Sequence, residues 1–298
     1  MVSKGMRRVL KLLSKRSELE LKKRVSESRK NLENLASLIE LPEDAIREDI
    51  EIKGIKAAWI NIPQSENDQI IYYLHGGGYM EGSIRTHQDL AMRIGKASRA
   101  KVLLIDYSLA PEKPYPAALN DSVEGYKWLI KDQKISPSKI IIAGDSAGGG
   151  LTLATLMKLR DLAITLPAAG ICLSPWTDLL MTGNSIGTKS QVDISLKVWD
   201  LYFMASLYMQ KNDPKDPYIS PLYGDFQGLP PLYIQVGNSE IILNDSTRVA
   251  ERAKEANVEV ILDIWDNMIH VFQAFADWAS EGKEAINKLG EFARSKFR

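Results

Sequence analysis

A serine flanked by small residues is the first candidate for chemistry in this sequence. Ser146 lies at the centre of Gly144–Gly148 (GDSAG), which fits the pattern G-x-S-x-G. The apolar run Ile140–Ala143 before it is typical of a strand, and Leu151–Leu162 after it is typical of a helix. A serine on such a sharp turn is held in a strained conformation, with its hydroxyl exposed above the edge of a sheet. We therefore predict that Ser146 is a nucleophile, rather than an incidental serine in a glycine-rich turn.

A second glycine-rich segment, His75–Gly78 (HGGG), follows the apolar run Ile70–Leu74. Consecutive glycines let backbone N–H groups approach a substrate oxygen closely. No G-K-[ST] follows the segment and it lacks G-x-G-x-x-G spacing, so a phosphate-binding loop is the weaker interpretation. We predict an oxyanion hole formed by the N–H groups of Gly77, Gly78 and Ala147.

Activation of a serine near neutral pH requires a histidine, and the sequence contains three. His75 belongs to the glycine segment, where a role in ordering the loop is more natural. His87 lies at the start of a predicted helix, which is typical of a surface or capping residue. His270 follows the strand-like run Val258–Trp265 and precedes the helix-like run Val271–Trp278. We predict that His270 is the general base.

The acid that orients the histidine should lie between the serine and the histidine in chain order. Glu240 lies in a loop just after the strand-like run Leu232–Val236 and could reach the far nitrogen of His270. Asp245 is the rival, although its position before a helix-like run suits an N-cap better. We predict Glu240 as the orienting acid.

The sequence predicts no metal or cofactor site. The histidines lack H-x-x-x-H spacing, and a single cysteine, Cys172, excludes a Cys-rich zinc cluster. Cys172 lies in the apolar run Ala168–Leu173, which is typical of a small buried residue rather than a nucleophile. One cysteine allows no intramolecular disulfide, in agreement with a reducing compartment.

The chain from about residue 48 predicts the scaffold that positions these residues. Short β-rich runs alternate with helix-like segments, which favours one domain with a mostly parallel sheet covered by helices on both faces. The predicted strands are Ala57–Ile62, Ile70–Leu74, Val102–Asp106, Ile140–Ala143, Ala168–Leu173, Leu232–Val236 and Val258–Trp265. The predicted helices lie near 88–98, 118–132, 147–162, 245–256 and 271–297.

Two segments do not follow this alternation. Residues 1–45 are rich in Lys, Glu, Arg and Leu and predict one or two amphipathic helices that end at Pro42. The pattern does not separate a solvated helical arm from a lid over a pocket. Residues 178–215 form an insertion rich in aromatic and Met residues. Such residues are typical of ordinary packing, but an insertion there could also cover a site at the carboxyl ends of the strands.

Composition excludes several classes of partner. Among 298 residues, 38 are basic and 38 are acidic, so no global field attracts nucleic acid or an anionic membrane. No apolar run approaches the ~20 residues of a transmembrane helix, and the N-terminus lacks the apolar core of a signal peptide. We therefore expect no stable membrane insertion and a cytoplasmic location.

The motifs together resemble those of the hormone-sensitive-lipase-like esterases, also called bacterial type IV esterases, from about residue 70 onward. His75–Gly78 matches the HGGG motif and Gly144–Gly149 matches GDSAGG. Asp106–Glu112 resembles DYRLAPE, Asp216–Leu222 resembles DPxxSPL, and His270–Phe272 resembles the HVF or HGF motif around the histidine. Five motifs in the family's order make the resemblance highly specific.

The resemblance implies an α/β-hydrolase fold with an eight-stranded, mostly parallel sheet flanked by helices. It implies a helical cap made of residues 1–45 and an insertion at about 178–215, on a catalytic domain spanning 46–298. It also implies a serine carboxylesterase that hydrolyses short-to-medium acyl esters through an acyl-enzyme, without a cofactor. Members often form homodimers through the last strand, here Val258–Trp265.

Alternatives and departures accompany this resemblance. An amidase or other acyl hydrolase would use the same triad, whereas a non-catalytic receptor is disfavoured because all three triad candidates are present. Ser108 replaces the family's usual arginine, so the salt bridge expected near Pro111 and Glu112 lacks its usual partner. Glu240 stands where many members have Asp.

Overall fold

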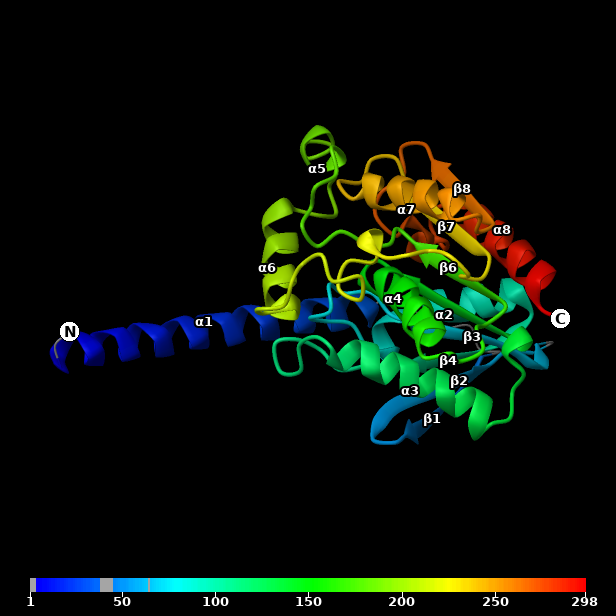
Figure 1. The fold of residues 1–298 in the computed structure, drawn as a ribbon, viewed down its shortest axis with the longest axis horizontal. Helices are drawn as coiled ribbons and strands as arrows, with labels where there is room; N and C mark the ends of the chain where they lie inside the picture. Colours follow the sequence, from blue (N-terminus) through cyan, green and yellow to red (C-terminus); the bar gives the residue numbers. More distant parts are fainter. Residues whose placement is uncertain (1–3, 38–44, 64) are drawn as a thin grey trace.

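An eight-stranded sheet forms the centre of the chain in a computed structural model that describes residues 4–37, 45–63 and 65–298 (Figure 1). The strand order is β1-β2-β4-β3-β5-β6-β7-β8. β2 pairs antiparallel with both β1 and β4, and the pairs from β4 through β8 are parallel. The strands are β1 Ile46–Ile52, β2 Ile55–Asn61, β3 Glu66–Leu74, β4 Ala100–Ile105, β5 Ile140–Asp145, β6 Ala169–Leu173, β7 Leu232–Gly237 and β8 Val260–Trp265.

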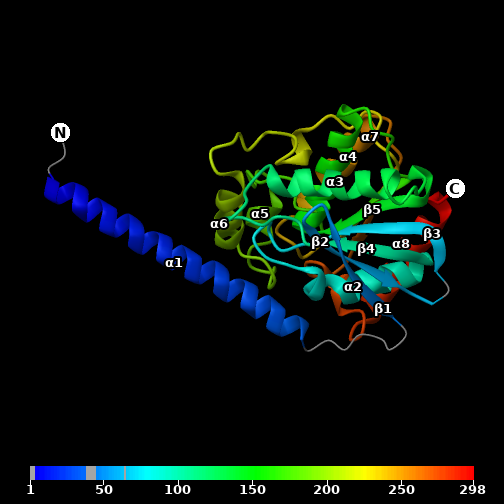
Figure 2. The ribbon, with the colours of Figure 1, turned by 90° about the horizontal axis from the view of Figure 1, so that it is seen from below.

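Helices cover both faces of this sheet (Figure 2). Helices α3, α4 and α7 pack on one face, and α2 and α8 pack on the other. The α-helices are α1 Lys4–Ala36, α2 Ile84–Ser98, α3 Ala117–Lys131, α4 Ala147–Asp161, α5 Ser185–Thr188, α6 Val198–Met209, α7 Leu243–Glu255 and α8 Ser280–Lys296. Short 3-10 turns are η1 Pro137–Lys139, η2 Pro221–Tyr223 and η3 Phe272–Phe275.

The continuous apolar runs form the central strands β3, β5, β6 and β7, whose side chains are buried on both faces of the sheet. Successive side chains of a strand point to opposite faces of the sheet. On β3, Tyr72 and Leu74 therefore pack in the core that includes α3 and α4, whereas Ile71 and Tyr73 pack in the core that includes α2 and α8. The predicted mostly parallel sheet between two helical layers is confirmed.

Two predictions about elements need correction. Strand β1 was not expected, because its sequence IREDIEI is largely polar and exposed. It forms because Lys53 and Gly54 adopt positive φ angles of 50° and 86° and turn the chain back as a hairpin onto β2. The helix predicted over 271–297 is two elements, η3 and α8. Ala279 is extended (φ −127°, ψ 123°) and interrupts the helix without a proline or glycine to signal the break.

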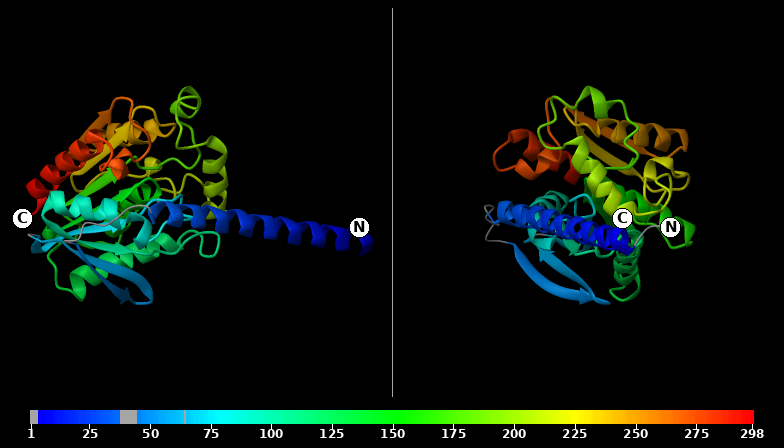
Figure 3. Two further views of the ribbon diagram at one scale, coloured as in Figure 1. Left: turned by 180° about the vertical axis from the view of Figure 1, so that it is seen from behind. Right: turned by 90° about the vertical axis from the view of Figure 1, so that its left-hand side faces the viewer.

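Helix α1 and helix α6 lie at the same end of the sheet (Figures 1 and 3). Arg24 of α1 donates to Asp200 of α6 at 2.8 Å, and its guanidinium lies 3.7 Å from the ring centroid of Phe203. The first turns of α1 extend away from the rest of the described chain. The described part of residues 1–45 contains one helix, which ends at Ala36, where one or two were predicted. The predicted end at Pro42 lies outside the described residues. Within the described part of the chain, no helix has the length and apolar character needed to cross a membrane.

Candidate active site

Ser146 lies on the turn between β5 and α4, as the pentapeptide predicts. Its backbone has φ 51° and ψ −121°, an unusual conformation for a residue with a side chain. Gly144 and Gly148 make this turn possible, since a Cβ at Gly148 would collide with the carbonyl oxygen of Leu74 and one at Gly144 with the carbonyl of Gly148. The Ser146 N–H donates to the carbonyl of Leu173 at 2.8 Å, which fixes the turn against β6.

Three side chains from three different loops form one hydrogen-bonded chain. Ser146 Oγ lies 2.9 Å from His270 Nε2, and His270 Nδ1 lies 2.7 Å from Glu240 Oε2. A carboxylate only accepts hydrogen bonds, so Nδ1 carries the proton and Nε2 is free to accept from Ser146. Each residue follows the carboxyl end of a strand: β5, β8 and β7, respectively. The structure therefore brings together the three predicted triad residues.

Glu240 is fully buried, and its second oxygen is also satisfied. Oε1 accepts from the Ser174 hydroxyl at 2.7 Å and from the Gly237 N–H at 2.6 Å. The Ser174 oxygen in turn accepts from the N–H of Val271 at 3.2 Å, next to His270. Sequence reasoning missed Ser174, whose only signal was its position directly after a predicted strand.

The environment of His270 favours its protonated form. Burial of the ring opposes the charge, but the hydrogen bond that His270 donates to Glu240 and the negative charge of Glu240 outweigh burial and raise the pKa of His270 above its usual 6.5. Glu240 therefore stabilises the imidazolium that would form when the histidine takes a proton from Ser146.

The glycine loop leaves backbone donors free beside Ser146. Gly77 and Gly78 adopt φ angles of 111° and 59°, in the left-handed region that glycine tolerates. Throughout the described residues their N–H groups have no acceptor. Ala147 is the first residue of α4, where N–H groups lack an intrahelical partner. These are the three donors predicted for an oxyanion hole.

The other two histidines lie beneath this loop and not on Ser146. His87 Nε2 lies 3.4 Å from Asp145 Oδ2, and Asp145 Oδ1 accepts from the Gly76 N–H at 3.0 Å. The ring of His75 stacks on Tyr107 with centroids 4.2 Å apart, and burial lowers the pKa of His75 to about 3. The prediction that His87 is a surface or capping residue was wrong, because its side chain is only 12% exposed and faces a buried carboxylate.

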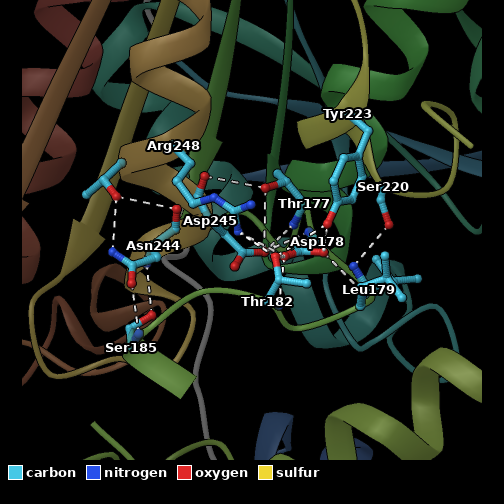
Figure 4. Close-up of polar contacts among 12 residues, drawn as sticks. Thr177, Asp178, Leu179, Thr182, Ser185, Ser220, Tyr223, Asn244, Asp245 and Arg248 are labelled. Carbon is cyan, nitrogen blue, oxygen red and sulfur yellow. Dashed lines mark hydrogen bonds and ion pairs between the residues drawn. The ribbon is translucent and has the colours of Figure 1, made fainter. Parts of the chain in front are cut away.

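Asp245 belongs to a different network, shown in Figure 4. It lies inside the first turn of α7 and its Oδ2 accepts from the N–H groups of Thr177 at 2.7 Å and Asp178 at 2.8 Å. Burial raises the pKa of Asp245 to about 7. The predicted N-cap role was wrong, since the carboxylate binds backbone of another loop and not the N-terminus of its own helix. The structure thus places Glu240, and not Asp245, on His270.

Position 108 lacks the family's usual arginine, and Arg29 of α1 forms a salt bridge with Glu112 instead. Its guanidinium forms a bidentate pair with Glu112, with N–O distances of 2.9 and 2.7 Å. It also donates to the carbonyl oxygens of Met80 at 2.8 Å and Ala110 at 2.9 Å. Met80 follows the glycine loop, so α1 is joined to the loop that carries the free N–H groups.

A cavity of about 270 Å³ lies beside the glycine loop, between α1 and α6. Its lining combines four apolar residues with six polar or charged ones. The apolar residues are Met80, Leu196, Phe203 and Met204, and the others are Arg24, Ser28, Glu81, Ser195, Lys197 and Asp200. The Met204 sulfur packs so closely on Gly78 that a Cβ at Gly78 would collide with it. No group of three His, Cys, Asp or Glu side chains suited to a metal occurs among the residues that the structure describes.

A hydrogen-bonded serine, histidine and carboxylate at the carboxyl edge of such a sheet is typical of α/β hydrolases. The family description "alpha/beta hydrolase fold" matches residues 71–274. An acetyl-hydrolase of Streptomyces hygroscopicus is 40% identical over 239 residues, covering 80% of this chain and 79% of that protein. An esterase of Acinetobacter venetianus is 36% identical over 247 residues, covering 83% and 81%.

A solved structure gives the same result. The crystal structure of an esterase from the bacterial hormone-sensitive lipase family matches with a TM-score of 0.90 at 43% identity and covers 92% of both chains. This chain belongs to the hormone-sensitive-lipase-like esterase family of the α/β-hydrolase fold. The fold class, the family and the carboxylic-ester hydrolase class predicted from the motifs are confirmed.

Proposed function

We propose that this chain hydrolyses short-to-medium acyl esters through an acyl-enzyme formed on Ser146. Ser146 Oγ attacks the ester carbonyl carbon while His270 Nε2 takes the hydroxyl proton. The carbonyl oxygen becomes an oxyanion near the N–H groups of Gly77, Gly78 and Ala147. His270 then gives the proton to the leaving alcohol as the C–O bond breaks. Water repeats the cycle, releasing the acid and restoring the serine.

The observation that carries this proposal is the hydrogen-bond chain beside free backbone donors. Ser146, His270 and Glu240 are joined at 2.9 and 2.7 Å, so proton transfer needs no rearrangement. Among the described residues, the N–H groups of Gly77 and Gly78 in the glycine loop have no acceptor. Donors that already point at the developing charge supply much of the rate enhancement in such enzymes, about 10²–10³-fold for one donor.

The acyl preference follows from the cavity next to the glycine loop. Met204 lines the cavity and packs on Gly78, and Phe203 and Leu196 add apolar surface to a lining that also includes charged residues. At about 270 Å³ it suits a short apolar acyl chain better than a long one. A p-nitrophenyl ester series should therefore turn over fastest at short chain lengths, with the matched p-nitroanilides as the amide comparison. Fastest turnover of long or charged esters would contradict this pocket.

Covalent labelling tests the mechanism directly. Diethyl p-nitrophenyl phosphate should phosphorylate the serine oxygen and release p-nitrophenolate, because the leaving group is displaced by the activated nucleophile. Peptide mapping should locate the diethylphosphoryl group on Ser146 in the wild type and find none in Ser146→Ala. Labelling at another residue, or none at all, would contradict the proposal.

We further propose a cytoplasmic location and a homodimer formed through β8. Strand β8 is the edge of the sheet, and its Ile261 and Ile264 side chains are 42% and 44% exposed. An exposed apolar edge strand is a ready surface for pairing with a second copy. The cap role of residues 1–45 and 178–215 is likewise a proposal, supported by the cavity between α1 and α6.

A further inference from the structure

Asp193 joins the insertion between β6 and η2 to the loop that carries Glu240. Its Oδ2 accepts from the N–H of Ile241 at 2.8 Å, the residue directly after Glu240. Its Oδ1 accepts from the N–H groups of Ser195 at 2.8 Å and Leu196 at 2.9 Å, which lead into α6. One side chain therefore connects the start of the α6 segment with the acid loop.

Asp193 is a buried carboxylate, and its hydrogen bonds explain why a charged side chain is stable there. The residue is only 2% exposed, and a buried carboxylate is costly unless hydrogen bonds stabilise it. The three backbone donors meet that need. A neutral side chain of similar size would fill the same space without the cost of desolvating a charge. The carboxylate is therefore best explained by the backbone groups that it holds in place.

A second contact from the insertion fixes the same residue of the acid loop. The Ser185 hydroxyl donates to the carbonyl of Ile241 at 2.7 Å, and the Ser185 N–H donates to Asn244 Oδ1 at 2.8 Å (Figure 4). Both backbone polar groups of Ile241 are thus bound by the insertion. The peptide after Glu240 cannot rotate without breaking its bond to Asp193, so the insertion restrains the backbone that carries the Glu240 side chain.

We propose that Asp193 is a positioning residue that holds Glu240 against His270. This inference rests on the proposed function, because it assumes that Glu240 orients His270 during catalysis. The negative charge of Asp193 also favours protonated His270, although its effect on the pKa is smaller than those of burial, Glu240 and Asp145. Loss of Asp193 should therefore affect the chemical step more than substrate binding.

The variants Asp193→Asn and Asp245→Asn test this assignment as a matched pair. An amide has one acceptor oxygen, so at position 193 its NH₂ group faces at least one of the bound N–H groups. The hydrogen bond to Ile241, or those to Ser195 and Leu196 before α6, is then lost. Asp245 is equally buried and lies in the first turn of α7, directly after the acid loop, but it binds Thr177 and Asp178 instead. An amide oxygen at position 245 still accepts both of those bonds.

With p-nitrophenyl butyrate, Asp193→Asn should lower kcat by about 10- to 100-fold with a much smaller change in KM, as expected for a misplaced catalytic group. The downfield proton resonance of His270 Nδ1–H should weaken or shift. Asp245→Asn should change neither. Ser185→Ala, which removes one bond to Ile241, should lower kcat by about fivefold and serves if Asp193→Asn does not fold.

Two outcomes would overturn the inference. The first is an Asp193→Asn or Ser185→Ala protein, folded by circular dichroism, that keeps wild-type kcat and the His270 resonance. The second is an Asp245→Asn protein in which kcat and the His270 resonance change as strongly as in Asp193→Asn. That result would mean that any change near the Glu240 loop disturbs the site. Glu240→Ala tests the assumption that Glu240 orients His270. If this variant retains wild-type kcat, Glu240 is not the orienting acid, and the role proposed for Asp193 is wrong as well.

Discussion

Two serine hydroxyls lie at opposite ends of one hydrogen-bond chain. Ser146 contacts one nitrogen of His270, and Ser174 contacts the carboxylate that holds the other. Ser174 also accepts from the N–H of Val271, so it ties the histidine loop to Glu240. We infer that it supports the orientation of both residues.

Replacing this hydroxyl gives a prediction at the residue scale. Ser174→Ala removes one donor from Glu240 and leaves the Val271 N–H unpaired, which costs about 1–3 kcal/mol if the group stays buried. We expect kcat to fall by about tenfold with KM nearly unchanged, measured with p-nitrophenyl butyrate. A variant with the kcat of the wild type would show that Gly237 alone suffices to hold Glu240.

The pH dependence of the reaction depends on the pKa of His270. The histidine must be neutral to take a proton, so kcat/KM should fall as the pH drops through its pKa. Burial lowers this pKa, but the hydrogen bond and charge of Glu240 raise it above 6.5 overall. Glu240→Gln removes the charge, so the acidic limb of the profile should move to lower pH. A limb that stays in place would mean that another group controls the titration.

Chain order and the small set of histidines made the triad predictable from sequence, whereas its supporting contacts were not. Ser146 was predicted from its motif, and His270 was predicted from its position and by elimination among three histidines. The roles of Ser174, Asp193 and Asp245 had no such signal, because each residue binds at least one group of a segment far away in the sequence. Such bonds depend on loop conformation, which local patterns do not encode.

At the scale of elements, Arg29 gives α1 its largest set of contacts near the glycine loop, and Ser28 and Glu33 add hydrogen bonds to Glu81 and Ser83. Arg29 donates to Met80 and Ala110 and pairs with Glu112, and these contacts join three parts of the fold. The sequence indicated that the arginine usual at position 108 was missing. It did not indicate that a helix from the N-terminal segment would supply one.

Arg29→Lys should be nearly as harmful as Arg29→Ala. An ammonium cannot reproduce the planar fork that reaches four acceptor contacts, so we expect a loss of about 2 kcal/mol in the free energy of unfolding. Thermal or urea unfolding measures this. Arg24→Lys is the control, because a lysine can keep a cation over the Phe203 ring and the exposed pair with Asp200 is worth about 1 kcal/mol or less. Equal losses at both positions would contradict the special role of Arg29.

Propensity and turn chemistry account for which elements were predicted. Apolar strands buried on both faces were evident from their runs of β-branched residues. Polar β1 was not, because its strand conformation comes from pairing with β2 rather than from its own pattern. The break between η3 and α8 could not be predicted, because the segment Ala276–Ala279 contains good helix formers and neither glycine nor proline.

At the scale of the whole molecule, the sheet has one polar edge and one apolar edge. β1 at the first edge exposes charged side chains, whereas β8 at the other exposes isoleucines. Charges on an edge strand oppose association with another chain, and apolar residues favour it. The last strand is therefore the edge where we expect a second copy to pair.

Ile264→Lys tests this expectation. A lysine at this exposed position of β8 would place like charges close together across a symmetric pair of strands. We expect light scattering with size-exclusion chromatography to give a dimer mass for the wild type and a monomer mass for the variant. Ile46→Lys, at the exposed start of β1, should leave the dimer intact. A monomeric wild type would contradict the proposed pairing.

The central claim is that Ser146 and His270 carry out ester hydrolysis. The most direct measurement is the hydrolysis of p-nitrophenyl butyrate by the wild type, Ser146→Ala and His270→Ala under identical conditions. We predict readily measured turnover by the wild type and a loss of at least about 10³-fold in kcat for each variant, because the two residues act as a unit. A folded Ser146→Ala protein that retains wild-type turnover would contradict the claim.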